Sequence, residues 1–594
     1  MSLVGVMVQG IPAAPGIVIG PAFVARWPRL EVPHATVGPD EIEAEVARFQ
    51  AARQLAKERT SGLREQVESR LGSVQAKIFD PQLMMLEDPD LIEGTLTYIC
   101  DSFLTAERAF SLRVLEFRSR WLDATHARVM DRVADLLDVQ LRVLETLIDI
   151  PGPEFAVDVD DPVILVAHEL TPSRMVDLDR SRVLGVATDA GTRTSHAAIL
   201  ARSIGLPCVV GLGDLSYRVE NGVEIILDGR RGKVLIAPSE SEKRWFHDRD
   251  ARAKQAEKQL EGTIGEEART RDGERIGLYA NLELPADARA AVAVNADGVG
   301  LFRTEFLVVG KTAVPAEEEQ YEAFKSVVDT LAPRPVTIRT FDLGGDKFPM
   351  FLPPIAEENP FLGWRGIRIY EMMPELFRYQ VRAALRAAAH GQVRLLVPMV
   401  NTVDEVQRIR AVIDEARREL ERDGIEHAVC PLGVMLETPA SVAIAAVLGR
   451  YVDFFSLGTN DLIQYMLAVD RGNAQLSRFF DLYHPALLMY IRDAVAAASA
   501  TGVPLCVCGE AASDPLGSLL LLGLGVRSLS CTPSAILGQK RLIRSIDLGQ
   551  VERVVSGLLD AETGREIREQ MVMKLGDVVD LAAVDADNNL SPSD

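Results

Sequence analysis

Three features are scarce in this sequence: cysteines, basic residues relative to acidic ones, and long apolar stretches. Six cysteines among 594 residues do not suggest a disulfide scaffold. Cys506 and Cys508 are separated by one residue, which is not the spacing of a zinc site. Without a membrane-spanning run or a basic, cleavable leader at the N-terminus, we expect a cytoplasmic protein with no membrane insertion.

The shortage of basic residues excludes one class of partner. The chain has 64 basic and 86 acidic residues, which gives a net charge of −22. Nucleic-acid phosphates repel a chain of this charge, so we expect no nucleic-acid partner. A small anionic substrate is compatible with the charge, because its binding depends on local arginines.

The length predicts about two to four domains, because a single hydrophobic core does not grow to this size. Residues 39–148 are rich in helix formers, with apolar positions three and four apart, and predict a helical bundle. Strand and turn patterns on both sides, in residues 1–38 and 149–238, predict one α/β domain that the bundle interrupts. Within the bundle, helices are expected over residues 41–69, 74–86, 106–123 and 128–147.

The second half of the chain has a different rhythm. Residues 239–271 are densely charged and predict an exposed linker helix, and residues 585–594 predict a disordered tail. In residues 272–584, short apolar runs alternate with helical stretches, as in a closed (β/α)8 barrel. An open doubly wound sheet is the alternative, although no glycine-rich fingerprint follows the first run. The runs are residues 276–281, 298–302, 336–341, 394–399, 432–436, 454–457, 504–507 and 527–530.

One histidine, His196, stands out in the first half. The preceding run, residues 183–187, predicts a buried strand, and residues 197–203 predict a helix that Gly205 and Pro207 end. His196 is therefore expected in the first helical turn, where free backbone N–H groups favour an anion such as phosphate and disfavour a charged imidazole. This segment alone leaves two interpretations open: a nucleophile that accepts phosphate, or a structural histidine bonded to a neighbouring hydroxyl.

Polar residues follow the predicted barrel strands, at the end where such barrels carry their catalytic groups. Guanidinium groups suit phosphate and carboxylate oxygens, and two carboxylates with water and substrate oxygens suit Mg²⁺. Each residue singly could be a surface ion pair or a buried thiol, but their occurrence at consecutive strand ends predicts one active site. They are the arginines Arg303, Arg339, Arg365 and Arg471, the carboxylates Glu437 and Asp461, the amide Asn460 and the thiol Cys508.

These stretches resemble one enzyme family. The phrases GTRTSHAAILARSIGLP, GLFRTEFL, RTFDLGGDK, EENPFLGWR, VMLETPA, FFSLGTNDLIQYMLAVDRGN and CGE are similar to those of the phosphoenolpyruvate-protein phosphotransferases, Enzyme I of the phosphotransferase system. The resemblance covers almost the whole chain. It implies a multidomain α/β protein: a phosphohistidine α/β swivel domain with an inserted helical bundle, and a C-terminal (β/α)8 barrel that binds phosphoenolpyruvate.

The resemblance also implies a role for each candidate residue. His196 would accept the phosphoryl group of phosphoenolpyruvate and pass it to the histidine-containing phosphocarrier protein HPr, docked on residues 39–148. Cys508 would protonate the leaving enolate to pyruvate, and Glu437 and Asp461 would bind Mg²⁺. The barrel would form a homodimer. The substrate contacts would be Arg303, Arg339, Arg365, Lys347, Asn460, Asp461 and Arg471.

The sequence departs from the family pattern in two places. Thr192 replaces a glycine in the histidine loop, and Cys531-Thr532 stands where the family often has Met-Ser. The second change is expected to place Cys531 near the barrel mouth. Neither change touches a residue with an implied role.

Three alternatives to a sugar-uptake phosphotransferase fit the sequence less well. A pyruvate-phosphate dikinase or a phosphoenolpyruvate synthase needs an ATP-binding domain, for which the chain has no segment left. A regulatory protein that binds phosphoenolpyruvate without turnover would not need His196 together with Cys508. Nitrogen-type regulation uses the same chemistry but commonly has an N-terminal sensory domain.

For turnover, we expect the α/β domain to swivel about residues 238–270.

Overall fold

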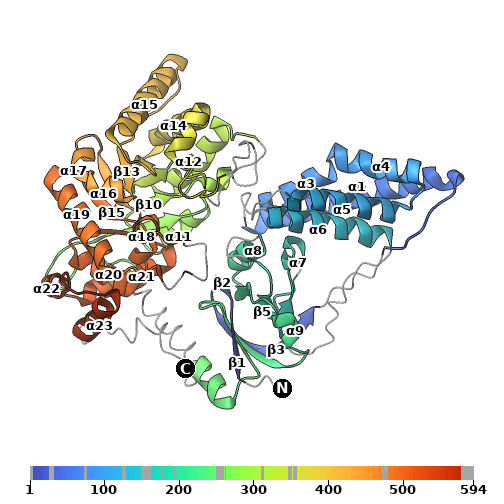
Figure 1. Cartoon of the computed structure of the whole chain (residues 1–594), viewed down its shortest axis with the longest axis horizontal. Coiled ribbons are helices and arrows are strands. Elements are labelled where there is room, and N and C mark those ends of the chain that lie inside the picture. Colours follow the sequence, from blue (N-terminus) through green and yellow to red (C-terminus); the bar gives the residue numbers. More distant parts are fainter. Residues whose placement is uncertain are drawn as a thin grey trace. The chain divides into compact units, whose positions relative to one another are not determined.

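The computed structural model divides into two compact units, Met1–Ala253 and Lys254–Asp594 (Figure 1). Each unit has hydrophobic clusters of its own. The structure describes residues 5–25, 32–71, 76–123, 129–148, 162–176, 178–191, 196–248, 260, 262–308, 313–344, 351, 357–470, 476 and 479–576.

The first unit contains an eight-stranded sheet with the order β1-β8-β7-β3-β4-β5-β6-β2. The central strands β3 to β6 are parallel, and the remaining pairs are antiparallel. Because β3 and β4 pair in space but flank the helical segment in sequence, the chain leaves this sheet and returns to it. The strands are β1 (Val6–Gln9), β2 (Ile11–Ala14), β3 (Ile17–Ala25), β4 (Val163–Ala167), β5 (Val183–Thr188), β6 (Cys208–Val210), β7 (Glu224–Asp228) and β8 (Lys233–Ile236).

Three short helices accompany this sheet: α7 (Pro172–Val176), α8 (His196–Ile204) and α9 (Leu215–Arg218). Helix α8 buries Ala198, Leu200 and Ala201 in the same hydrophobic cluster as Val186 of β5. The predicted helix after residue 196 is thereby confirmed, and His196 is its first residue.

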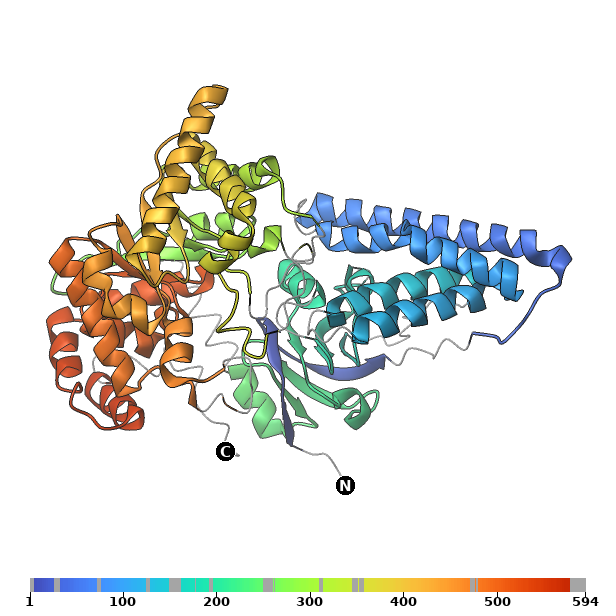
Figure 2. The ribbon, with the colours of Figure 1, turned by 45° about the horizontal axis from the view of Figure 1, so that its top comes forward.

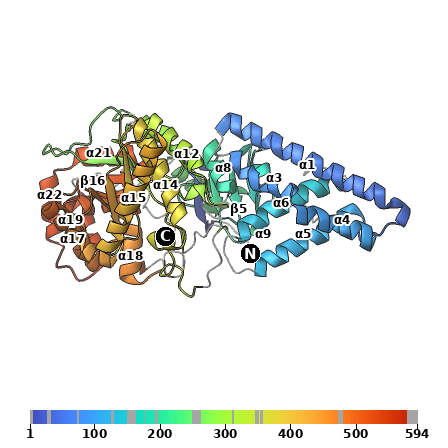
Figure 3. The ribbon, with the colours of Figure 1, turned by 90° about the horizontal axis from the view of Figure 1, so that it is seen from above.

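The helical segment folds as a bundle in which α1 contacts α6 and α5 packs between α4 and α6 (Figure 2). Its core includes Phe49 and Ala56 of α1, Phe110 of α5 and Val143 of α6. Figure 3 shows the same bundle from above, with α1 as its longest helix. The helices are α1 (Ile42–Leu71), α3 (Asp80–Leu86), α4 (Pro89–Ser102), α5 (Ala106–Asp123) and α6 (Val129–Leu147).

Helix α4 is missing from the four helices that the sequence predicted. It begins after Asp88, whose side chain caps the helix by accepting a hydrogen bond from the Leu91 N–H at 3.1 Å. It then buries Leu91, Thr95 and Ile99, which lie four residues apart on one face. The Asp-Pro start and a central glycine made this stretch resemble a loop.

The second unit is a closed barrel of eight parallel strands, as predicted, with the helices around the strands (Figure 1). Every strand boundary lies within two residues of its predicted apolar run. The strands are β9 (Gly277–Leu282), β10 (Val299–Phe302), β11 (Val336–Arg339), β12 (Val393–Val397), β13 (Leu432–Leu436), β14 (Phe454–Leu457), β15 (Leu505–Val507) and β16 (Ser528–Cys531).

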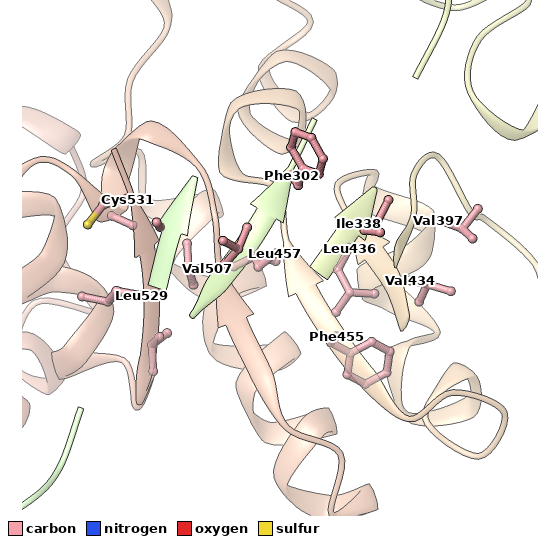
Figure 4. Close-up of a cluster of buried hydrophobic side chains, with 14 of the residues drawn as sticks. Phe302, Ile338, Val397, Val434, Leu436, Phe455, Leu457, Val507, Leu529 and Cys531 are labelled. Atoms are coloured by element: carbon pink, nitrogen blue, oxygen red, sulfur yellow. The ribbon is translucent and has the colours of Figure 1, made fainter. Parts of the chain in front are cut away.

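Side chains alternate along these strands between two environments, as the pleat of a strand requires. One set, labelled in Figure 4, packs between the strands and the helices; it includes Ile338, Phe455 and Val507. The other set forms a separate, inward cluster of Leu301, Leu396, Met435, Phe454 and Cys508.

Cys531 is the last residue of β16, which puts it at the carboxyl end of the barrel, where the predicted site residues lie. Its side chain nevertheless belongs to the outward set and is fully buried, turned away from the inward cluster. Burial raises the pKa of the Cys531 thiol to about 12, so we assign it a packing role.

The helices that position or surround the site are α12 (Glu317–Leu331), α14 (Pro374–Ala387), α15 (Val403–Asp423), α18 (Thr459–Leu467), α19 (Pro485–Thr501) and α20 (Pro515–Gly523). Of the predicted linker helix, residues 240–248 are helical, and residues 249–259 and 261 lie outside the described residues. The predicted disordered tail also lies outside them. Among the described helices, none is both long and apolar enough to cross a bilayer.

Candidate active site at the carboxyl end of the barrel

The parallel barrel brings the carboxyl ends of its strands to one rim, and polar side chains follow several of them. Arg303 follows β10, Arg339 ends β11, Glu437 follows β13 and Cys508 follows β15. After β14, Asn460 and Asp461 occupy the first turn of α18. The predicted strand-end residues that the structure describes are therefore on one rim.

Two buried arginines form a network with carboxylates at this rim. The Arg339 guanidinium pairs with Glu305 at 2.6 Å and with Asp342 at 3.4 Å. Arg365 donates from Nε and Nη2 to the two oxygens of Asp342, at 3.0 and 2.9 Å, and its Nη1 lies 2.9 Å from Asp461. Burial lowers the pKa of each arginine, but the carboxylates outweigh it and raise both above the ordinary value. Both guanidinium groups are therefore charged and fixed in direction.

Glu437 is fully buried beside this network. Its Oε1 accepts a hydrogen bond from the Met399 N–H at 2.7 Å, whereas Oε2 has no hydrogen-bond partner among the described residues. Burial, together with repulsion from Asp461 and Asp342, raises the pKa of Glu437 to about 8. A buried carboxylate with one unbonded oxygen is a suitable cation ligand. A cation would bind the unbonded oxygen, and its charge would stabilise the ionised carboxylate against burial and against repulsion from the neighbouring carboxylates.

A glycine allows α18 to begin close to Glu437. A Cβ atom on Gly458 would lie 3.1 Å from Glu437 Oε2 and 3.0 Å from its Cβ, which is closer than ordinary packing. The next turn places Asp461 toward Arg365, and Asn460 Oδ1 accepts a hydrogen bond from the Glu510 N–H at 3.0 Å. Glu437, Asp461 and Asn460 thus come from neighbouring strand ends.

The Cys508 thiol is buried at the same end of the barrel. Ser456 Oγ donates a hydrogen bond to Cys508 Sγ at 3.1 Å, and Sγ lies 3.6 Å from the Leu457 carbonyl oxygen, to which it donates. Asn281 Nδ2 donates to the Cys508 carbonyl at 3.0 Å. Burial raises the pKa of the Cys508 thiol, and the Ser456 hydrogen bond and the charge of Arg339 partly oppose that rise. The neutral thiol is therefore the resting form.

Four predicted site residues remain, and the structure describes one of them fully. Arg303 lies at the rim, where it forms an ion pair with Glu283 at 2.9 Å. His196 begins α8 of the first unit, and its side chain lies outside the described residues, as do Lys347 and Arg471.

Sequence reasoning missed the residues that hold the predicted ones in place. Glu305 and Asp342 orient the arginines, and Ser456 and Asn281 hold Cys508. A signal was available, because Glu305 stands two residues after Arg303 and Asp342 three residues after Arg339. Within the described part of the chain, no group of three or more His, Cys, Asp or Glu side chains is placed to hold a metal ion.

Comparison with known proteins agrees with this architecture. Three models of PEP-utilising enzymes match the chain: the N-terminal model over residues 9–132, the mobile-domain model over 159–232 and the PEP-binding-domain model over 257–548. They define the class of protein as a PEP-utilising enzyme.

Curated relatives then give the family. The phosphoenolpyruvate-protein phosphotransferase of Priestia megaterium is 36% identical over 95% of this chain and 98% of the relative. That of Staphylococcus carnosus is 36% identical over 94% and 97%, and that of Haemophilus influenzae is 37% identical over 94% and 98%. The chain belongs to the phosphoenolpyruvate-protein phosphotransferase family and is an enzyme of phosphoryl transfer.

Proposed function

We propose that this enzyme transfers the phosphoryl group of phosphoenolpyruvate to its own His196 and then to the phosphocarrier HPr, releasing pyruvate, as the first step of sugar uptake. The observation that carries the proposal is the convergence of oriented arginines, an incompletely bonded Glu437 carboxylate and the Cys508 thiol at one rim of the barrel. This combination provides anion binding, a cation ligand and a proton donor.

The arginines would bind the substrate. Arg303, Arg339 and Arg365 would contact its phosphate and carboxylate oxygens, and Asn460 would add a neutral donor, with Asp461, Lys347 and Arg471 nearby. Support comes from the network of Asp342 and Glu305, which fixes two of the guanidinium groups before any ligand arrives. Such preorganisation lowers the barrier, because the donors need not reorient when charge develops on the phosphoryl group.

Mg²⁺ would be held by Glu437 and Asp461. The fit rests on the unbonded, buried Oε2 of Glu437 and on the short separation that Gly458 allows between the strand ends. Two carboxylates with water and substrate oxygens complete the coordination that this ion prefers. When bound, the ion neutralises charge on the phosphate.

The chain's own residues would carry the bond changes. A nitrogen of His196 forms a bond to phosphorus while the bond between phosphorus and the enol oxygen breaks. The resulting enolate takes the proton of the Cys508 thiol at its terminal carbon and becomes pyruvate. Because His196 belongs to the first unit and Cys508 to the second, we propose that the α/β domain swivels about residues 238–270 to reach both the substrate and HPr.

The remaining features of the proposal follow from the family. Residues 1–38 with 149–238 would be the phosphohistidine domain, 39–148 the HPr-docking domain and 272–584 the substrate-binding barrel, through which two copies would associate. We place the enzyme in the cytoplasm, because all six cysteines lie in the described part of the chain and all are free thiols.

The first test is labelling with radioactive phosphoenolpyruvate and Mg²⁺, on the wild type and on His196→Ala. We expect a label on the wild type that is stable to base and lost in acid, and no label on the variant, because a phosphorylated histidine has this stability. A wild type that binds phosphoenolpyruvate without becoming labelled would instead indicate a regulatory protein. Cross-linking the two units should stop turnover, and unchanged transfer in the cross-linked protein would refute the swivel.

A further inference from the structure

Ser456 lies where it can act on the proposed proton donor. It is the third residue of β14, and its side chain belongs to the inward set, between the outward-facing Phe455 and Leu457. Cys508 directly follows β15, which pairs with β14 in parallel register, and the Cys508 N–H donates to the Leu457 carbonyl at 3.1 Å. The backbone pairing of β14 with β15 therefore fixes both chain segments and sets the distance between the Ser456 and Cys508 side chains.

The hydrogen bond between them has a defined direction. Ser456 Oγ is the donor and Cys508 Sγ the acceptor, at 3.1 Å, and both side chains are buried. Within the described part of the chain, this is the only hydrogen bond of the Ser456 hydroxyl. The thiol hydrogen is directed elsewhere, toward the Leu457 carbonyl oxygen. The hydroxyl thus remains a donor to sulfur whether or not sulfur carries its proton.

Other charged and titratable groups act on this sulfur from several strands. Arg303 after β10 and Arg339 at the end of β11 favour a negative sulfur, whereas Glu437 after β13 opposes it. Cys506 of β15 is a half-buried neighbouring thiol, and burial raises the pKa of this thiol. In contrast to these groups, Ser456 acts on Sγ through a hydrogen bond that the structure describes.

We propose that Ser456 is a positioning residue that stabilises the Cys508 thiolate formed when the thiol protonates the enolate. This inference rests on the proposed function. In the step, the Sγ–H bond breaks and its electron pair stays on sulfur. The proton bonds to the terminal carbon, and the enolate oxygen becomes the pyruvate carbonyl. A proton from water then restores the thiol, and in the reverse reaction the same thiolate removes a methyl proton from pyruvate.

The test is the exchange of isotopically labelled pyruvate into phosphoenolpyruvate, with Mg²⁺ and the full-length enzyme but no carrier protein. This exchange requires both phosphoryl transfer and proton transfer. Because a hydrogen bond to a charged group is lost, we expect Ser456→Ala to slow the maximal exchange by at least about tenfold. The phosphoenolpyruvate concentration at half-saturation should stay unchanged. The solvent deuterium isotope effect should rise, because proton transfer becomes rate-limiting.

An isosteric pair of variants separates the hydroxyl from its packing. Ser456→Thr keeps a hydroxyl group, whereas Ser456→Val has a methyl group in place of that hydroxyl. The two new side chains have the same shape, so both variants add the same bulk to the barrel interior. We expect the threonine variant to exchange much faster than the valine variant.

The outcomes distinguish this inference from the function on which it rests. If Cys508→Ala abolishes exchange while Ser456→Ala retains the wild-type rate and isotope effect, the role of Ser456 is wrong and the proposed function stands. If Cys508→Ala exchanges normally, the role of the thiol fails and that of Ser456 with it. Equal rates in the threonine and valine variants would show that Ser456 acts through packing alone and would overturn the proposal.

Discussion

At the scale of single residues, the ionised form of Glu437 destabilises the folded protein. Its pKa is raised from 4.5 to about 8, first by burial and then by repulsion from Asp461 and Asp342. Between these two values the native state keeps a proton that the unfolded state has lost. Stability therefore falls as the pH rises between the two pKa values, by about 1.4 kcal/mol for each pH unit. The full penalty is present above about pH 8 and absent below the unfolded pKa.

Replacing this carboxylate by its neutral isostere should stabilise the metal-free protein. We expect Glu437→Gln to raise the melting temperature in EDTA at alkaline pH, to have little effect in mild acid, and to remove the stabilisation by Mg²⁺. Glu510→Gln, at an exposed glutamate of the same rim, is the control and should follow the wild type. A Glu437→Gln protein less stable than the wild type at alkaline pH would contradict the assigned cause of the raised pKa.

Some residues of the site could be predicted from the sequence, and others could not. Arg339, Glu437 and Cys508 were predicted to meet because barrel topology brings strand ends to one rim. Their partners were not predicted. The spacing places Glu305 and Asp342 close to the arginines in sequence, but it does not define which way their side chains point, and no sequence signal connects Ser456 with Cys508.

At the scale of elements, one arginine connects three helices of the barrel. Arg382 of α14 pairs with Glu317 of α12 at 2.5 Å, and with Glu419 and Asp423 of α15 at 2.9 and 3.3 Å. Its side chain is 9% exposed, against 39% for Arg378, which pairs with Glu419 one turn away. The two arginines have the same chemistry but different burial, so their contributions to stability should differ.

Truncation of the two arginines should show this difference. We expect Arg382→Ala to lower the free energy of unfolding by about 2 kcal/mol or more, because it removes a buried cation from three carboxylates and leaves Glu317 and Glu419 with one arginine each. Arg378→Ala should cost less than about 1 kcal/mol, as an exposed pair does. Urea unfolding followed by circular dichroism measures both, and equal effects would refute the assigned role of burial.

Elements were predicted best where the apolar pattern is strong. All barrel strands were found because each is a short apolar run between helical stretches. Helix α4 was missed because Gly94 lies at its centre, and the reason for that glycine is tertiary. The Arg113 side chain passes where a Cβ of residue 94 would lie, and its guanidinium donates to the Asp90 carbonyl at 3.1 and 3.2 Å. The helix propensity of a segment depends on its own residues, so it cannot indicate a contact with Arg113 of another helix.

At the scale of the whole molecule, the separate hydrophobic cores of the two units predict separate unfolding. Differential scanning calorimetry of the full chain should resolve at least two transitions. Phosphoenolpyruvate with Mg²⁺ should raise the transition of the barrel unit, since a ligand stabilises the part that binds it. A single transition that shifts as a whole on ligand addition would contradict this independence.

The contact between the ends of β14 and β15 has a consequence for protein engineering. Asn460 accepts from the Glu510 backbone, and Gly509 leaves room for the Thr459 hydroxyl, which a Cβ at that position would meet. The two loops therefore behave as one module with a shared interface. A designer who grafts either loop onto another barrel would have to transplant both together, and random libraries that vary one loop alone should yield few folded members.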